Sequence, residues 1–431
     1  MGKISKILAA GALALAMAGC SSGGSGSSAS GSYVATVTGY DWGCGTNKVI
    51  VTLPEAIDSV SVDDVTVSEH KQVTDWSAED FPVIEADVDR TVEKAYLVDE
   101  DGKETTEASD KVCLELYVSP NDGSPFLYTM ATGYNTWSDP YQLTIKIGDT
   151  EVTEGTLETV VDDIAEDSFE ASDGTVYNYA HYDVEDSDTV FVWLHGMGEG
   201  GAKDVGDATN VKVTELANKV TAFYGEEFQE ALGGANILVP QAPTFWLDMT
   251  GEGVSESRLD ANDGSSYYTE SLKELIDDYA ESVGASKIIL AGCSNGGFMV
   301  MNMAVNYPDA WTALVPICEA YKDENLKDED IEAIKDIPMF FIYSKADTTV
   351  DPTVYEEPTL KRLNDAGASN VKVFAPEDVH DNTGLYFDET EDGEKVPHVY
   401  SGHWSWIYFD NNEAVAEDGT NCWTWLGDQV K

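Results

Sequence analysis

The hexapeptide GCSNGG at residues 292–297 is the part of the chain whose residue types point most clearly to chemistry. An apolar run at 287–291 precedes it and another at 298–301 follows it, which predicts a strand, a tight turn and a helix. Glycines on both sides of Ser294 allow a sharp turn, because a Cβ there would clash. Ser294 is therefore predicted to be a nucleophile at the end of a sheet, and Cys293 to pack into the core.

A serine nucleophile needs a histidine that takes its proton. In proteins with this strand–turn–helix motif the base follows the serine and the acid in the chain, and three histidines follow Ser294. His403 lies in SGHWSW, just before a predicted closing helix, and is favoured. His380, directly after the last predicted strand, and His398 are the alternatives.

The acid that orients the histidine is expected after a strand predicted at 339–343. Asp347, in the segment SKADTTVDP, follows that strand and would lie at the carboxyl edge of the sheet. Asp351 and Glu319 are alternatives. Strand context decides between them, because in a chain with 80 Asp and Glu residues closeness in sequence proves little.

A glycine-rich loop, LHGMGEGG at 194–201, follows another predicted strand. Acyl transfer needs two hydrogen-bond donors aimed at the developing oxyanion. We expect the backbone N–H of Asn295 to be one donor and that of Met197, in this loop, to be the other. His195 is expected to shape the loop and not to act as the base.

The elements that must position these residues alternate between strands and helices from residue 166 onward. Continuous apolar runs predict strands at 189–194, 236–240, 287–291, 313–317, 339–343 and 371–374, and helices are expected at 267–283 and 421–430. The alternation predicts a mostly parallel sheet flanked by helices, and hence an α/β catalytic domain over 166–431.

Residues 33–150 follow a different pattern, with short alternating segments that are rich in Val, Thr and Tyr. Strands are expected at 33–38, 48–53, 112–117 and 141–147. No long helical pattern interrupts them, so this half is predicted to be a small β-sandwich. Residues 149–165 bridge the two halves.

Acidic residues far outnumber basic ones, 80 against 24, and give a net charge of −56. Such a surface repels nucleic acid and anionic lipid, so neither is expected as a partner. The six cysteines form no CxxC pattern, which argues against a zinc ribbon or a thioredoxin-like site. Cys44 and Cys113 are candidates for a disulfide in an oxidising compartment, with free buried thiols as the alternative.

The first residues, MGKISKILAAGALALAMAGC, have the pattern of a bacterial lipoprotein signal. Two lysines precede an apolar stretch at 7–17 that is too short to span a bilayer. We predict a signal peptide at 1–19, lipidation of Cys20 and a Ser/Gly-rich tether at 20–32. The protein is then extracellular and held at the membrane by its lipid alone. An ordinary secretory signal is the alternative.

These motifs resemble the α/β-hydrolase superfamily, and most of all bacterial esterases related to predicted peptidases and polyhydroxybutyrate-depolymerase-like enzymes. The resemblance covers about 185–431 and rests on four segments: LHGMGE (194–199), GCSNGG (292–297), the Asp347 loop and GHW (402–404). In that group a His-Trp pair, with Trp-Leu in the final helix, carries the base, which supports His403. The sequence departs from the group by an insertion at 381–400, between the last predicted strand and His403. For this reason His380 stays an alternative for the base.

The segment YNTWSDPY at 134–141 resembles the immunoglobulin-like domain that precedes some of these esterases. In the family such a domain is thought to aid assembly or to shape the mouth of the active site, so oligomerisation through the β domain is a further expectation.

The resemblance implies a serine carboxylic-ester hydrolase that forms an acyl-enzyme on Ser294, needs no cofactor or metal, and acts on a small-molecule or polymer-borne ester. A serine peptidase with the same triad and an inactive surface-binding lipoprotein are the alternatives.

Overall fold

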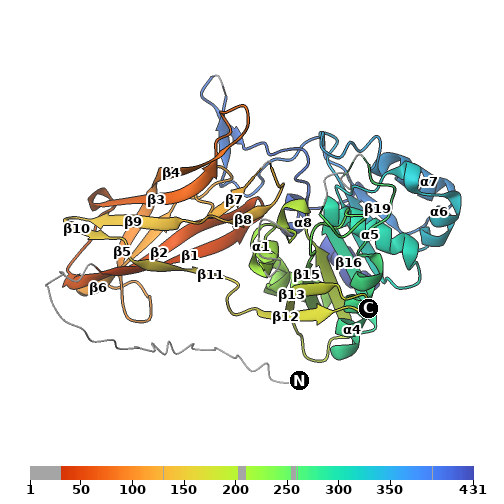
Figure 1. The fold of residues 1–431 in the computed structure, drawn as a ribbon, viewed down its shortest axis with the longest axis horizontal. Helices are drawn as coiled ribbons and strands as arrows, with labels where there is room; N and C mark the ends of the chain where they lie inside the picture. Colours follow the sequence, from red (N-terminus) through yellow and green to blue (C-terminus); the bar gives the residue numbers. More distant parts are fainter. Residues whose placement is uncertain (1–30, 130, 202–209, 254–258, 260, 391) are drawn as a thin grey trace.

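The computed structural model describes residues 31–129, 131–201, 210–253, 259, 261–390 and 392–431. The predicted signal peptide, Cys20 and most of the predicted tether lie outside the described residues. The chain forms an all-β domain followed by an α/β domain, and the two lie side by side (Figure 1).

The all-β domain is a sandwich of two sheets. One sheet has the order β11 (Gly155–Thr159), β1 (Ser32–Tyr40), β2 (Gly43–Ile57), β6 (Ser109–Leu116) and β5 (Val92–Val98). The other has the order β10 (Thr150–Val152), β9 (Tyr141–Ile147), β3 (Val65–Thr74) and β4 (Val83–Arg90), with a 3-10 turn, η1 (Val62–Asp64), before β3. Alternate residues of the strands point inward, so the apolar faces of both sheets form one core.

A short hairpin joins the sandwich to the second domain. It consists of β7 (Phe126–Tyr128) and β8 (Asn135–Trp137). The Trp137 Nε1–H donates to Asn210 Oδ1 of the α/β domain at 2.8 Å. Tyr134, just before β8, is buried in the core of the α/β domain, so the hairpin is part of both domains.

The α/β domain is built on one eight-stranded sheet. Its order is β12 (Ala165–Glu170), β13 (Val176–Tyr182), β15 (Asn236–Gln241), β14 (Thr189–Leu194), β16 (Lys287–Cys293), β17 (Ala313–Ile317), β18 (Met339–Ile342) and β19 (Val371–Phe374). The last six strands of this order run parallel to one another. Strand β13 is antiparallel to both of its neighbours, β12 and β15. The carboxyl ends of the parallel strands therefore share one edge.

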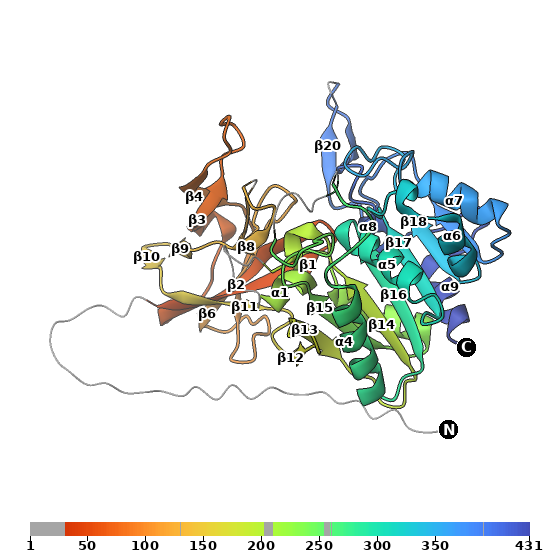
Figure 2. The ribbon, with the colours of Figure 1, turned by 45° about the vertical axis from the view of Figure 1, so that its right-hand side comes forward.

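Helices cover both faces of this sheet (Figure 2). Residues of α4 (Thr269–Ser282), α5 (Asn295–Asn306), α6 (Asp328–Ile334) and α7 (Glu356–Asp365) pack into one core. Residues of α1 (Val211–Leu216), α2 (Thr221–Tyr224), α3 (Glu226–Leu232), α8 (Trp406–Asp410) and α9 (Cys422–Gln429) pack into the other. Strand β14 contributes side chains to both cores. Val190 and Val192 belong to the first, and Phe191 and Trp193 belong to the second. No described helix has the length and apolar character to cross a membrane.

Three small elements complete the described chain. They are the 3-10 turns η2 (Met197–Glu199) and η4 (Asp323–Asn325), and a hairpin of β20 (Phe387–Glu389) and β21 (Lys395–Pro397). The hairpin accounts for the insertion expected at 381–400.

The predicted architecture is confirmed: a mostly parallel sheet with helices on both faces follows an all-β domain. All ten predicted strands and the three predicted helices, at 267–283, after Ser294 and at 421–430, are present. The sequence analysis placed no strand at 149–165, whereas β10 and β11 lie there and pair with β9 and β1 of the sandwich.

The candidate disulfide between Cys44 and Cys113 is not formed, and the alternative of free buried thiols holds. Both are free and buried, as are the other three cysteines that the structure describes. Cys113 pairs across the sheet with Ile50, six residues along β2 from Cys44. At about 3.3 Å per residue that offset is on the order of 20 Å. A disulfide requires Cα atoms within about 7 Å.

The two domains also meet at the tip of the β1–β2 turn. Trp42 packs into the second core of the α/β domain and meets Tyr386 edge to face, with ring centroids 5.9 Å apart. The carboxylate of Asp41 accepts a hydrogen bond from Asn411 Nδ2, and its carbonyl oxygen accepts one from Trp406 Nε1 at 3.0 Å. The domains are therefore joined by apolar packing and by hydrogen bonds.

The α/β domain buries several carboxyl groups. Burial raises the pKa of Glu199 to about 7 and the pKa values of Glu215 and Glu319 to about 8. Burial likewise raises the pKa values of Glu356 and Asp410 well above the ordinary range. These groups hold protons in the folded protein at pH values where the unfolded chain has lost them.

The free energy of unfolding is therefore expected to fall as the pH rises from about 5 to 9, because the folded state binds more protons than the unfolded state over that range. We expect the thermal midpoint to be roughly 5 °C lower at pH 9 than at pH 6. Calorimetry at several pH values measures this. Glu319→Gln, which cannot ionise, should flatten the slope, and a midpoint that rises with pH would contradict the interpretation.

Candidate active site

Ser294 lies in the turn between β16 and α5, at the carboxyl edge of the sheet. Its backbone has φ 54° and ψ −113°, which is uncommon for a residue with a side chain. A Cβ on Gly296 would lie 1.9 Å from the carbonyl oxygen of Leu194, and one on Gly292 would lie 2.7 Å from the same atom. Glycine is thus required on both sides, and the packing against β14 holds the serine in its strained conformation.

The structure brings Ser294, His403 and Asp347 together. His403 Nε2 is 2.8 Å from Ser294 Oγ, and His403 Nδ1 is 2.7 Å from Asp347 Oδ2. The Asp347 side chain is almost fully buried and that of His403 is 12% exposed. These three predicted residues therefore form a continuous chain of hydrogen bonds, with the hydroxyl at its accessible end.

Asp347 lies in the loop after β18, as predicted, and its own loop fixes it. Its Oδ1 atom accepts backbone hydrogen bonds from Thr349 at 2.8 Å and Val350 at 2.9 Å. These bonds leave Oδ2 to the imidazole. A carboxylate that is held this way can fix the orientation of the ring and the tautomer of His403.

The loop that carries His403 packs directly on the Asp347 loop. A Cβ on Gly402 would lie 2.2 Å from the carbonyl oxygen of Ala346. Glycine at this position therefore permits the close approach that brings His403 within hydrogen-bond distance of Asp347.

The two alternative histidines lie elsewhere and bind other carboxylates. His380 Nδ1 is 2.8 Å from Asp378 Oδ1, and His398 Nδ1 is 2.7 Å from Asp388 Oδ1. His380 also closes an isolated bridge with Val399, at the base of the inserted hairpin. The His380 side chain is therefore held by its own loop, and that of His398 by the inserted hairpin.

The two alternative acids are engaged with their own loops. Asp351 is exposed, and its Oδ1 accepts from the backbone N–H and the hydroxyl of Thr353. Glu319 is fully buried, and its Oε2 accepts from the backbone N–H of Tyr321 at 2.6 Å. The structure joins neither of them to His403.

The glycine-rich loop lies beside the serine turn. A Cβ on Gly296 would lie 2.7 Å from the carbonyl oxygen of His195, so the loop touches the start of α5. Met197 and Asn295 are the first residues of η2 and α5. The first N–H groups of a helix have no partner within it, so these two backbone groups are the ones in the two turns that a ligand could bind. Asn295 Oδ1 accepts from the backbone N–H of Leu247 at 2.9 Å, which fixes its side chain.

His195 is fully buried beneath this loop. Its Nε2 accepts a hydrogen bond from the backbone N–H of Ala242 at 2.9 Å, and its Nδ1 lies 2.5 Å from the carbonyl oxygen of Gly196. Burial lowers the pKa of His195 to about 4. The ring is thus a neutral bridge that shapes the loop, in the place that the sequence analysis expected.

The sequence analysis missed the contact between this loop and the first domain. Glu199 Oε1 accepts a hydrogen bond from Asn135 Nδ2 at 3.0 Å. Both residues lie in segments that the sequence singled out, at 194–199 and 134–141. The signal that could have found the contact is a carboxylate in an otherwise apolar, glycine-rich loop, since such a group must find a donor when it is buried.

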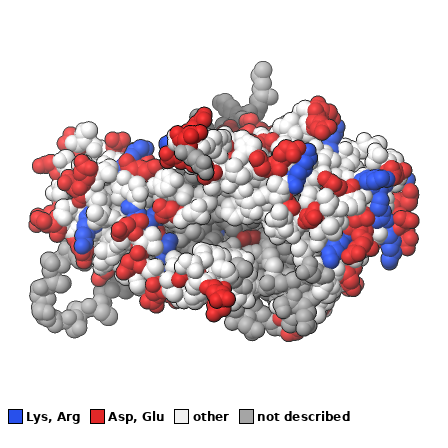
Figure 3. Space-filling view, turned by 90° about the horizontal axis from the view of Figure 1, so that it is seen from above, with Lys and Arg blue, Asp and Glu red and all other residues white. Residues whose placement is uncertain are grey.

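Charge is unevenly distributed on the face of the molecule that Figure 3 shows. Seen from above, acidic side chains lie around both ends of the face, and a hollowed, mostly uncharged band runs between them (Figure 3). No group of three or more His, Cys, Asp or Glu side chains in the described part of the chain has the geometry to hold a metal ion.

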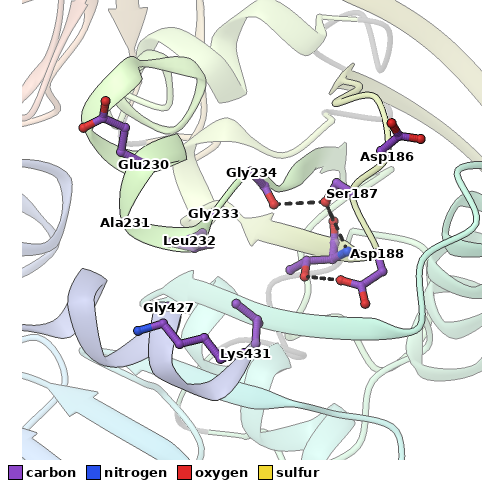
Figure 4. Close-up of a pocket in the computed structure, with 12 residues that line it drawn as sticks. Asp186, Ser187, Asp188, Glu230, Ala231, Leu232, Gly233, Gly234, Gly427 and Lys431 are labelled. Carbon is purple, nitrogen blue, oxygen red and sulfur yellow. Dashed lines mark hydrogen bonds between the residues drawn. The ribbon is translucent and has the colours of Figure 1, made fainter. Parts of the chain in front are cut away.

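A separate pocket of about 330 Å³ lies at the opposite end of the sheet (Figure 4). It is lined by Asp186–Thr189, Glu230–Gly234, Gly427, Val430 and Lys431. These residues surround the amino end of β14, whereas Ser294 follows the carboxyl end of β16. The pocket is therefore no part of the site around Ser294.

The close approach of Gly402 generates a prediction about the His403–Asp347 hydrogen bond. In Gly402→Ala the new Cβ would force the two loops apart, so we expect the far-downfield proton resonance of His403 Nδ1–H to be lost. Histidine-labelled protein in ¹H–¹⁵N NMR measures it. Lys361→Ala is the control, because Lys361 is an exposed residue of α7 whose side chain pairs with Asp365 and with neither loop. A resonance that survives in Gly402→Ala would contradict the prediction.

Comparison with known proteins identifies both domains. Residues 32–159 match a family described as the esterase Ig-like N-terminal domain, and residues 183–383 match a family described as phospholipase/carboxylesterase. The second match ends before His403. No curated protein matches the chain in sequence at a significant level.

Among solved structures, a thermostable esterase has a TM-score of 0.65 and 18% sequence identity, with 89% of this chain and 97% of that chain covered. A ferulic acid esterase has a TM-score of 0.39 and 10% identity, with 62% of this chain and 98% of that chain covered, and this likeness is too low to support an inference. The first structure covers both domains. The chain is thus an α/β-hydrolase of the esterase type that carries an N-terminal immunoglobulin-like domain.

Proposed function

We propose that this protein is a serine carboxylic-ester hydrolase that works through an acyl-enzyme on Ser294. The observation that carries the proposal is the unbroken path from Ser294 Oγ through His403 to Asp347, with contacts of 2.8 and 2.7 Å. The phospholipase/carboxylesterase match at 183–383 supports the ester as the bond that is cleaved.

In the acylation half-reaction, Ser294 Oγ attacks the carbonyl carbon of the ester while His403 Nε2 takes the hydroxyl proton. Asp347 keeps the proton on Nδ1 and stabilises the imidazolium that forms. His403 then gives its proton to the leaving alcohol as the C–O bond breaks. The acyl group remains as an ester on Ser294.

The negative charge that develops on the carbonyl oxygen needs preorganised donors. The backbone N–H groups of Asn295 and Met197 are assigned to this role, because both open helices beside the nucleophile. Loss of one such donor typically costs about 10²–10³ in kcat.

Deacylation repeats the same steps with water. His403 takes a proton from the water as its oxygen attacks the acyl carbon, and then returns that proton to Ser294 Oγ. The carboxylic acid leaves and the free serine is restored. The full cycle consumes one water and releases one alcohol and one carboxylic acid.

The first test is fluorophosphonate labelling of the purified protein with mass-spectrometric mapping. We expect one label, on Ser294, that is absent from Ser294→Ala and nearly absent from His403→Ala. Turnover of p-nitrophenyl acetate should fall by about 10⁴-fold or more in both variants, because nucleophile and base act as one unit.

His380→Ala is the matched control and should keep both label and turnover. Loss in His380→Ala with survival in His403→Ala would contradict the assignment of the base. No label on folded wild-type protein would favour the inactive surface-binding lipoprotein. Turnover of peptide anilides but not of esters would favour a serine peptidase with the same triad.

We also propose that the protein is an extracellular lipoprotein, lipidated on Cys20. The support is the sequence at 1–32 alone, in which an apolar stretch, small residues before Cys20 and a Ser/Gly run follow each other. Cells fed an alkyne fatty acid should yield labelled protein in the membrane fraction. Cys20→Ala should be unlabelled, and a wild-type protein without lipid would contradict the proposal.

A further inference from the structure

The immunoglobulin-like domain touches the loop assigned to the oxyanion through one polar contact. Asn135 is the first residue of β8, and its Nδ2 donates to Glu199 Oε1 at 3.0 Å. Glu199 ends η2, the turn that Met197 begins. A side chain of one domain thus binds the loop that is assigned to catalysis in the other.

The Glu199 side chain folds back against the start of its own loop. The residue is 7% exposed, so its carboxyl group lies inside the loop and not in solvent. A Cβ on Gly196 would lie 3.0 Å from Glu199 Oε2. The carboxyl group therefore lies under the turn that orients the Met197 N–H, and a shift of the carboxyl group would move that turn.

Glycines let the first domain lie directly on the loop. A Cβ on Gly198 would lie 2.8 Å from Asn135 Nδ2, and one on Gly200 would lie 3.2 Å from the ring of Tyr134. Tyr134 is buried in the same core against which Met197 packs. Two adjacent residues of the immunoglobulin-like domain therefore hold the loop, one by apolar packing and one by a hydrogen bond.

We propose that Asn135 is a positioning residue for the oxyanion loop, which it holds in register through Glu199. This inference rests on the proposed function. A donor acts on the oxyanion only when it lies about 2.7–3.1 Å from the developing charge, so a small displacement of the Met197 N–H weakens catalysis. The immunoglobulin-like domain then contributes to the rate of the chemical step and not to substrate affinity.

The test compares two Asn→Ala substitutions in the full-length protein, each of which removes one side-chain amide at the boundary between the domains. Asn135→Ala removes the amide that binds Glu199. Asn411→Ala removes an amide that binds the Asp41 carboxylate across the same domain boundary, away from the loop. With p-nitrophenyl acetate we expect kcat to fall about tenfold or more in Asn135→Ala with KM changed less than twofold. Asn411→Ala should match the wild type.

A double-mutant cycle tests whether Asn135 acts through Glu199. Glu199→Ala should reproduce the loss, and Asn135→Ala should add nothing to it, because residues that act in series are not additive. Glu199→Gln retains a carbonyl acceptor for Asn135 and should recover most of kcat. Titration with a fluorophosphonate measures the concentration of active sites, and kcat is calculated from that concentration and not from total protein. Asn135→Leu has a similar size and no donor, and it replaces the alanine variant if that variant does not accumulate.

Three outcomes would overturn the inference: an unchanged kcat in Asn135→Ala, an equal loss in Asn135→Ala and Asn411→Ala, or fully additive losses in the cycle. The second would mean that domain docking in general, and not this contact, sustains the rate. A wild-type protein that hydrolyses no ester would instead refute the proposed function, and the two failures are thus distinguishable.

Discussion

The contact between Gly296 and the carbonyl oxygen of Leu194 is the constraint on which the rest of the site depends. Without a side chain at 296, α5 starts directly against the end of β14, and the turn before it places Ser294 at φ 54°. An isolated chain would relax this conformation at a gain of about 1–3 kcal/mol. Here β14, β16 and β17 over-determine it, because Ser294 N–H also donates to the carbonyl oxygen of Ile317 at 2.8 Å. The strain is thus held by the buried centre of the sheet.

The other two members of the triad come from loops that have no such support from regular structure. Asp347 is fixed by backbone donors of its own loop, and His403 is fixed by Asp347 and by the close packing of Gly402. The geometry is therefore built outward from one rigid element. The serine is set by the sheet, the aspartate by the loop after β18, and the histidine by the aspartate.

The sequence predicted most of this arrangement because the relevant signals are local. The Ser294 turn between a buried strand and an apolar helix is contiguous in the chain, and so is the Asp347 loop after its strand. The choice of His403 over His380 was harder, since the inserted hairpin at 381–400 separates it from the last strand. The contact of Asn135 with Glu199 could not be predicted, because it joins residues 64 positions apart in two domains. Strands β3 to β5 were missed, since charged residues interrupt their apolar pattern.

The buried, unpaired thiols have a consequence of a different kind. Cys44 and Cys113 lie in the immunoglobulin-like domain, and Cys293, Cys318 and Cys422 lie in the α/β domain, all free and all buried. The described fold therefore depends on no disulfide between these thiols. Each thiol becomes reactive only when its surroundings open. The chain thus carries internal reporters in both domains, and their reaction with a thiol reagent would show which domain opens first.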